Sequence, residues 1–286
     1  MTSAAPSPCR RSDLPIALFD SGAGGLSVWR EVAALLPNES TIYLADHAHV
    51  PYGARPAAEI EALTHAAVAW LLAQGAKLVV IACNTASAAA LVSLRQRWPD
   101  IAIVGMEPAV KPASERTRSG KVAVMATPGT LQAGRFSSLV ERYAGGVEVY
   151  TQVCPGLVEH VEAGDLDGPA LETALHGYLD PLVAAGVDHL VLGCTHYPFL
   201  LPAIRRVVGE TMTIIDPAPA VARQAQRLLQ ADGCLAPPRE RPSHRFYTTG
   251  EAETLTRGLA RLLHLAQPHP TAQQVRLESP LTVRTE

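Results

Sequence analysis

Cysteine, lysine and long apolar runs are all scarce in this 286-residue sequence. The five cysteines are scattered and none forms a CxxC pair, which argues against a disulfide framework and favours a reducing, cytoplasmic setting. There are three lysines, Lys77, Lys111 and Lys121. Two of them stand at predicted strand starts and Lys111 lies between the predicted lobes, so none is placed to be the Schiff-base lysine that pyridoxal phosphate requires.

An excess of charge of either sign is also missing. The formal net charge is −3, which indicates neither a nucleic-acid partner nor a polybasic membrane surface. No apolar run approaches the roughly 20 residues that span a bilayer, so no membrane association is expected. Residues 1–15 contain no apolar segment of signal-peptide length and are expected to form a short disordered tail. Residues 268–286 are expected to form a polar tail.

Apolar residues are plentiful and their order is regular. Hydrophobic residues make up 48% of the chain and charged residues 18%, which allows an ample core. Short apolar runs alternate with Ala- and Leu-rich segments of helical length, the pattern of a parallel sheet covered by helices. Strands are expected at 14–19, 41–45, 78–82, 101–105, 121–126, 147–151, 189–193 and 213–215. Helices are expected at 26–36, 57–74, 84–95, 130–143, 171–185, 199–208, 217–230 and 251–265.

The pattern occurs twice, with equivalent points 105 to 110 residues apart. We therefore predict an α/β protein of two pseudo-symmetric lobes, each a mainly parallel, doubly wound sheet flanked by helices, with the active site in the cleft between them. The first lobe is expected to comprise residues 16–107 and 217–267, and the second residues 108–216. In the returning segment, Phe246-Tyr247 is a candidate edge strand, and the stretch from Gln152 to Gly164 is expected to be a loop.

Two of the cysteines occupy matching places in this repeat. Cys83 closes the apolar run 78–82, and Cys194 closes the run 189–193. A thiol at the junction of a strand and a helix N-terminus is expected to have a lowered pKa. Two such thiols, one per lobe, suit a reaction that needs a base on one face of a carbon and an acid on the other. The pattern therefore predicts a cofactor-independent racemisation or epimerisation.

Further polar residues follow the predicted strands, where ligands of parallel α/β sheets collect. Their hydroxyls, together with backbone N–H groups at helix N-termini, suit a carboxylate or a phosphate. The candidates are Asp20, Ser21, Tyr52, Gly53, Asn84, Thr85, Thr127, Thr130, Thr195 and His196.

Two other ligand classes are less well supported. Gly22-Ala23-Gly24-Gly25-Leu26-Ser27 is close to a dinucleotide fingerprint, but Ser27 replaces the third glycine and Asp20 would crowd a pyrophosphate. No metal site is expected, since His47, His49 and His196 lack a zinc-ligand spacing with the cysteines. We expect His47 and His49 to be solvated loop residues.

Five motifs in order resemble the aspartate/glutamate racemase family, and within it the members that act on glutamate. They are Phe19-Asp20-Ser21-Gly22-Ala23-Gly24-Gly25-Leu26, Pro51-Tyr52-Gly53, Ala82-Cys83-Asn84-Thr85-Ala86, Ala126-Thr127-Pro128-Gly129-Thr130 and Gly193-Cys194-Thr195-His196-Tyr197-Pro198. The resemblance implies a cytoplasmic, cofactor-independent isomerase that supplies D-glutamate for peptidoglycan and hence cell-wall synthesis. It also implies a homodimer.

The same resemblance implies residue roles. Cys83 would deprotonate D-glutamate and Cys194 would deprotonate L-glutamate. Asp20, Glu162 and His196 would tune the two thiols, with Glu162 taken from the segment 157–164. Ser21, Tyr52, Gly53, Asn84, Thr85, Thr195 and His196, with Asp20, would hold the substrate.

Other functions remain open from the residues alone. A racemase for aspartate would use the same thiols, whereas a lyase or decarboxylase on this fold would keep only one of them. A two-lobed binding protein would use the cysteines only for packing. A redox dithiol would form a Cys83–Cys194 disulfide.

Overall fold

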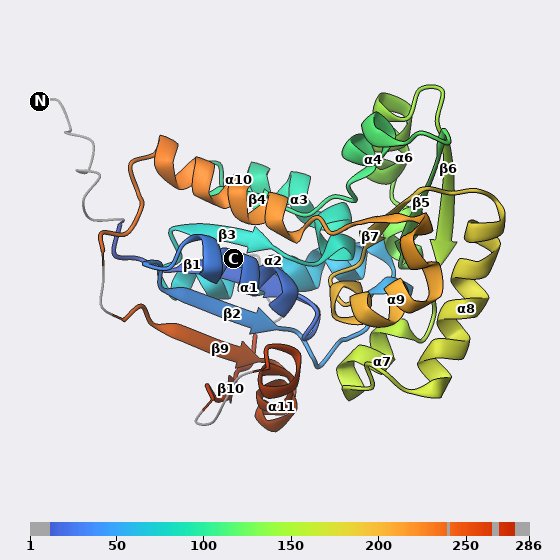
Figure 1. The fold of residues 1–286 in the computed structure, drawn as a ribbon. Coiled ribbons are helices and arrows are strands. Elements are labelled where there is room, and N and C mark those ends of the chain that lie inside the picture. The colour runs from blue at the N-terminus through green and yellow to red at the C-terminus, as the bar shows by residue number, and fades with distance from the viewer. Residues whose placement is uncertain (1–11, 239–240, 265–268, 278–286) are drawn as a thin grey trace, which may run out of the picture.

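The computed structural model describes residues 12–238, 241–264 and 269–277, and these form two parallel sheets flanked by helices (Figure 1). The predicted α/β class is confirmed. Most of the predicted tail at residues 1–15, Cys9 and the end of the polar tail lie outside the described residues. The predicted lobe boundaries at 108 and 216 stay a prediction.

The first sheet has the strand order β10-β9-β2-β1-β3-β4, with every neighbouring pair parallel. Its strands are β1 (Ile16–Asp20), β2 (Thr41–Ala45), β3 (Leu78–Ile81), β4 (Ala102–Gly105), β9 (His244–Thr248) and β10 (Ala272–Gln274). The associated helices are α1 (Leu26–Leu35), η2 (Tyr52–Ala54), α2 (Ala57–Ala73), α3 (Asn84–Arg97), α10 (Ala218–Ala231) and α11 (Ala252–Leu262). All residues of β1, β2 and β3 are buried, as expected for strands covered on both faces.

The second sheet has the order β6-β5-β7-β8 and is also parallel. Its strands are β5 (Lys121–Ala126), β6 (Glu148–Val153), β7 (His189–Gly193) and β8 (Thr213–Ile215). Its helices are α4 (Val110–Arg116), α5 (Pro128–Leu131), α6 (Gly134–Tyr143), α7 (Leu157–Ala163), α8 (Pro169–Ala184), η3 (Tyr197–Leu200), α9 (Leu201–Val208) and η4 (Gly209–Thr211).

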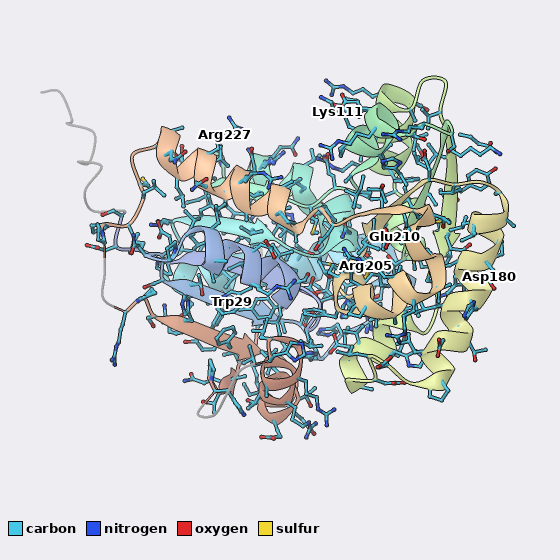
Figure 2. All side chains as sticks on the ribbon, viewed as in Figure 1. Trp29, Lys111, Asp180, Arg205, Glu210 and Arg227 are labelled. Atoms are coloured by element: carbon cyan, nitrogen blue, oxygen red, sulfur yellow. The ribbon has the colours of Figure 1, made fainter. Side chains whose placement is uncertain are left out.

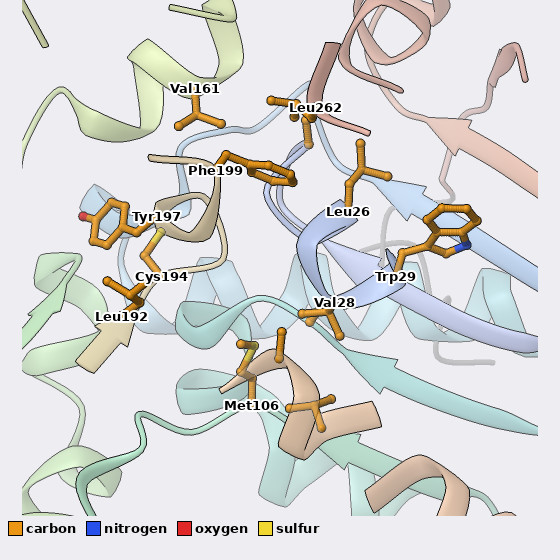
Figure 3. Packing of buried hydrophobic residues seen from close by; sticks show 14 of the residues in the cluster. Leu26, Val28, Trp29, Met106, Val161, Leu192, Cys194, Tyr197, Phe199 and Leu262 are labelled. Atoms are coloured by element: carbon orange, nitrogen blue, oxygen red, sulfur yellow. The ribbon is translucent and has the colours of Figure 1, made fainter. Parts of the chain in front are cut away.

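One apolar cluster is shared by the two sheets. Leu26 and Val28 of α1 belong to the same cluster as Leu192, Tyr197 and Phe199 from the β7 end (Figure 3). Charged side chains lie on the outer faces instead, as the exposed Lys111, Asp180 and Arg227 show in Figure 2. The hydrophobic effect therefore holds the two sheets together along this side.

Several predicted elements differ from the structure. The stretch expected to be a loop contains α7, which is flanked by the capping residues Gly156 and Gly164, both at positive φ. Its Leu157 and Val161 are buried. The helix expected at 130–143 is divided into α5 and α6, and α4 was not expected.

The C-terminal segment also differs from expectation. Phe246 and Tyr247 do form a strand, but β9 is not at the edge, because β10 pairs outside it. Residues 272–274, expected in a polar tail, form β10, which is held in the sheet by backbone pairing and by the burial of Ala272.

Candidate active site

The carboxyl ends of β1, β3 and β7 meet at a small cavity between the two sheets. Its volume is about 20 Å³, room for about one water molecule. Its lining contains both candidate thiols, Cys83 from the first sheet and Cys194 from the second. The other lining residues are Ser21, Pro51, Tyr52, Gly53, Asn84, Thr85, Thr127, Val158, Thr195 and His196.

Cys83 caps the N-terminus of α3. The Ala86 N–H donates to its sulfur at 3.4 Å, and the Ser21 hydroxyl lies 3.7 Å from it. Burial, and after it the charge of the nearby Asp20, nevertheless raise the pKa of Cys83 to about 12. The expected lowering of the pKa of this thiol is therefore wrong for this conformation, because desolvation outweighs the two hydrogen bonds.

Cys194 has a different environment. It follows β7 and precedes only the single-turn η3, so it does not stand at the N-terminus of an α-helix as predicted. Its partner is a side chain instead, since the His196 Nδ1 lies 3.7 Å from its sulfur.

Glu162 holds His196 from the other side. One of its carboxylate oxygens, Oε1, accepts hydrogen bonds from His196 Nε2 at 2.7 Å and from the Ala23 N–H at 2.8 Å. Burial lowers the pKa of His196, but its hydrogen bonds to Cys194 and Glu162 outweigh this and raise the pKa well above its usual value. Burial likewise opposes ionisation of Glu162, yet bonds to His196 and His47 lower its pKa. An imidazole paired with a carboxylate therefore stands beside Cys194, in surroundings that favour its protonated form.

Asp20 lies behind the cavity and joins the two sheets. Its carboxylate accepts from the Gly22 N–H at 2.8 Å and from the Thr195 hydroxyl at 3.0 Å. Burial raises its pKa, and the charge of His196 opposes that rise. The Ser27 hydroxyl donates to the Thr195 carbonyl at 2.9 Å, so a second hydrogen bond fixes the same loop.

The polar wall opposite contains an amide without a protein partner. Neither side-chain polar atom of Asn84 forms a hydrogen bond to any described residue, although Asn84 is buried. Beside it, the hydroxyl of Thr85 lies 2.8 Å from that of Thr127 and 3.1 Å from that of Thr130. Because buried polar groups are normally paired, Asn84 is the clearest sign of a polar ligand in this cavity.

Tyr52 lines the same cavity with its hydroxyl already engaged. The hydroxyl donates to Asp46 at 2.6 Å, and burial together with Asp46 raises its pKa well above the usual value. Gly53 lies so close to Thr127 that a Cβ would approach its side chain to 2.7 Å. Thr130, one of the predicted ligands, lies behind Thr85 and outside the cavity lining.

The glycine-rich turn after β1 is covered by the other sheet. A Cβ on Gly24 would overlap the His196 ring, and one on Gly22 would overlap the Glu162 carboxylate. Because these glycines lack a Cβ, the Glu162 and His196 side chains pack directly against the backbone of the turn. They occupy the place where a dinucleotide would need room for its pyrophosphate. In this conformation the turn has no room for a pyrophosphate.

A model of the Asp/Glu/hydantoin racemase family matches residues 24–225. The chain belongs to this family. It is 51% identical over 260 residues to a glutamate racemase of Ectopseudomonas mendocina (strain ymp), covering 91% of this chain and 98% of that protein. It is 54% identical over 225 residues to a glutamate racemase of Roseiflexus sp. (strain RS-1), covering 79% and 83%.

Solved structures show the same relation. The glutamate racemase isoform RacE1 of Bacillus anthracis has a TM-score of 0.83 at 33% identity, over 93% of this chain and 98% of that chain. A glutamate racemase of Francisella tularensis, in complex with D-glutamate, has a TM-score of 0.82 at 29% identity, over 94% and 99%.

Sequence reasoning missed Val158, which lines the cavity of this racemase site, and His47, which lies behind it. His47, expected to be solvated, has a side chain that is 6% exposed and bonds to Glu162 Oε2 at 3.1 Å. Its burial depends on β9, about 200 residues away in the chain, so no local pattern indicates it. His49, in contrast, has a partly exposed side chain that bonds to Asp46.

No metal-binding cluster and no membrane span are found in the part of the chain that the structure describes. Among residues 12–238, 241–264 and 269–277, no group of three or more His, Cys, Asp or Glu is arranged to hold a metal ion. No described helix is both long and apolar enough to cross a membrane.

Proposed function

We propose that Cys83 and Cys194 are the two acid–base groups of a cofactor-independent glutamate racemisation. The chain catalyses the interconversion of L- and D-glutamate, which supplies D-glutamate for peptidoglycan synthesis, in line with its identity to glutamate racemases over nearly its whole length. The observation that carries the two-thiol mechanism is that one cavity is lined by both cysteines, each from a different sheet.

The reaction balances with these two groups alone. One thiolate removes the α-proton of glutamate, which leaves a carbanion, and the opposing thiol donates a proton to the other face. The roles exchange for the other enantiomer, Cys194 acting on L-glutamate and Cys83 on D-glutamate. The substrate's ammonium group assists, because a positive charge beside a buried thiol favours the thiolate and opposes the burial that raises the pKa of Cys83 to about 12.

The charged residues behind the cavity stabilise these protonation states. His196, cationic beside Cys194, is placed to stabilise negative charge on that sulfur. Glu162 keeps the imidazole oriented. Asp20 fixes the loop through Thr195, and its carboxylate is placed to attract the substrate's ammonium group.

The polar wall suits the two carboxylates of glutamate. The unpaired Asn84 amide and the hydroxyls of Thr85 and Thr127 provide hydrogen-bond donors. Ser21, Thr195 and the backbone of Tyr52-Gly53 complete the wall. Thr130 holds Thr85 and Thr127 in place.

The cavity must widen for glutamate to enter. A volume of about 20 Å³ admits a water molecule but not an amino acid. The shared apolar cluster closes one side, so we propose that the sheets open on the side of the Thr85–Thr127 contact. We also propose that the enzyme is a cytoplasmic homodimer, which the family resemblance supports.

The test is incubation of one glutamate enantiomer in deuterated water without added cofactor, following optical rotation and α-deuterium together. We expect loss of rotation with one deuterium in the product. Cys83→Ser and Cys194→Ser should each lower racemisation by orders of magnitude, whereas Cys234→Ser, a buried thiol outside the cavity, should not. Faster turnover of aspartate than of glutamate would contradict glutamate as the substrate. Full activity in both Cys83→Ser and Cys194→Ser would contradict the two-thiol mechanism.

A further inference from the structure

The Glu162 carboxylate has a second histidine partner that the two-thiol mechanism does not use. Its Oε1 accepts hydrogen bonds from His196 and from the Ala23 N–H. Its Oε2 forms a hydrogen bond with His47 Nε2 at 3.1 Å. His47 lies in the loop after β2, and its side chain is 6% exposed. It is absent from the cavity lining, so it reaches the reacting atoms only through Glu162.

The hydrogen bonds around His47 run in one direction. The Gly250 N–H donates to the Thr248 hydroxyl oxygen at 3.1 Å, and that hydroxyl lies 2.9 Å from His47 Nδ1. If the hydroxyl donates to Nδ1, the ring carries its hydrogen on Nε2 and donates it to Glu162. The Thr248 hydroxyl and both ring nitrogens of His47 are then paired, as a buried hydrogen-bond network requires.

The loop carrying His47 is anchored to the end of β9. The Thr249 hydroxyl donates to Asp46 and accepts from the Ala48 N–H at 3.1 Å. Gly250 packs so closely that a Cβ there would lie 2.8 Å from the Cβ of His47. Thr248 lies beyond residues 24–225, which the family model matches, so the anchor comes from a part of the chain outside that match.

We propose that His47, held by Thr248, is a positioning residue: it fixes one oxygen of Glu162 so that the other aims His196 at Cys194. The proposal rests on the two-thiol function above and adds a residue to the Cys194 side of it. Without His47, the carboxylate keeps Ala23 and His196 but is free to rotate about them. An error of about 1 Å in such an array costs about 100-fold in rate.

The two directions of racemisation cannot be told apart by kcat/KM. The enantiomers have equal free energy, so kcat/KM falls equally in both directions for any variant. The α-deuterium isotope effect does separate them. Suppose that proton transfer at Cys194 becomes slower. The deuterium isotope effect on kcat/KM then rises with L-[α-²H]glutamate, because Cys194 breaks the labelled bond of this enantiomer. It falls with D-[α-²H]glutamate, where Cys83 breaks it.

The experiment measures both isotope effects, kcat and KM in the purified full-length racemase. For His47→Leu we expect kcat to fall about 10- to 100-fold, KM to change little, and the isotope effects to shift in opposite directions as described. His47→Gln retains an N–H donor and should recover most of kcat. His176→Leu, which changes an exposed histidine of α8 that bonds to Asp180 instead of Glu162, should leave all values unchanged.

The other outcomes overturn the proposal. Lower activity with unchanged isotope effects would make His47 a merely structural residue. Reversed shifts would place its influence on Cys83. If His47→Leu does not fold, Thr248→Val, which removes one hydroxyl, carries the same isotope test in milder form. Failure of the two-thiol function would be visible separately, as a wild-type protein without racemisation or with fully active Cys83→Ser and Cys194→Ser.

Discussion

Replacing Asn84 with alanine should weaken substrate binding without weakening the fold. The Asn84 amide is buried and has no protein partner, so the folded chain carries a polar group that only a cavity water or a ligand can pair. An unpaired buried polar group costs about 1–3 kcal/mol. The substitution Asn84→Ala removes this unpaired amide at the cost of a small loss of packing. It should therefore change the free energy of unfolding by between zero and about +2 kcal/mol.

Affinity should change in the opposite sense. A hydrogen bond to a charged group contributes about 1.5–3 kcal/mol, so losing the amide should raise the Kd for glutamate about 10- to 150-fold. Calorimetric titration with glutamate measures this affinity, and urea unfolding measures the stability. At about 2–4 °C per kcal/mol, the Tm should stay or rise by a few degrees.

Ser87→Ala in the same helix is the matched control. The Ser87 hydroxyl is buried but fully paired, donating to the Ile81 carbonyl at 3.0 Å and accepting from the Met106 N–H at 2.9 Å. This variant should lose about 1–3 kcal/mol of stability and retain its glutamate affinity. The reasoning is refuted if Asn84→Ala loses as much stability as Ser87→Ala and still binds glutamate normally.

Three further changes have definite signs. Lys77→Met removes the 2.6 Å ion pair between Lys77 and Glu39 and leaves Glu39 charged and buried. It should therefore lower the free energy of unfolding, measured by urea unfolding, by about 3–5 kcal/mol. Adding Glu39→Gln should restore part of this lost stability. Gly24→Ala puts a Cβ into the His196 ring and should lower kcat at least tenfold with a folded circular-dichroism spectrum, whereas activity equal to wild type would contradict the packing. Burial raises the pKa of Cys154 to about 12, so its contribution to stability is complete below about pH 8.5 and is lost as pH rises toward 12, by about 1 kcal/mol per pH unit. Cys154→Val should make the alkaline decline in unfolding free energy shallower by that amount, and an unchanged slope would refute it.

The sequence predicts much of this site because parallel sheets gather strand ends at one edge. Cys83 and Cys194 each end an apolar strand, so the repeat alone indicates that they share a site. Asn84 and Thr195 follow them directly and are placed by the same rule. The structure brings these residues to one cavity.

Other features depend on contacts that no local pattern encodes. His47 is buried because Thr248, 201 residues later, bonds to its ring. The pKa of Cys83 follows the local rule for helix N-termini only in part, because the burial of the thiol outweighs it. The helix α7, which supplies Glu162, was missed because it has only seven residues and lies between two glycines, a pattern typical of a loop.

The position of β9 has a consequence for the newly made chain. This strand pairs directly with β2 and is the scaffold for the loop that carries His47. Before residues 244–250 have left the ribosome, β2 has an unpaired edge and the loop beside it lacks its anchor. The nascent protein therefore contains both thiols before the segment that anchors His47 is available, and the site is complete only once β9 has paired with β2.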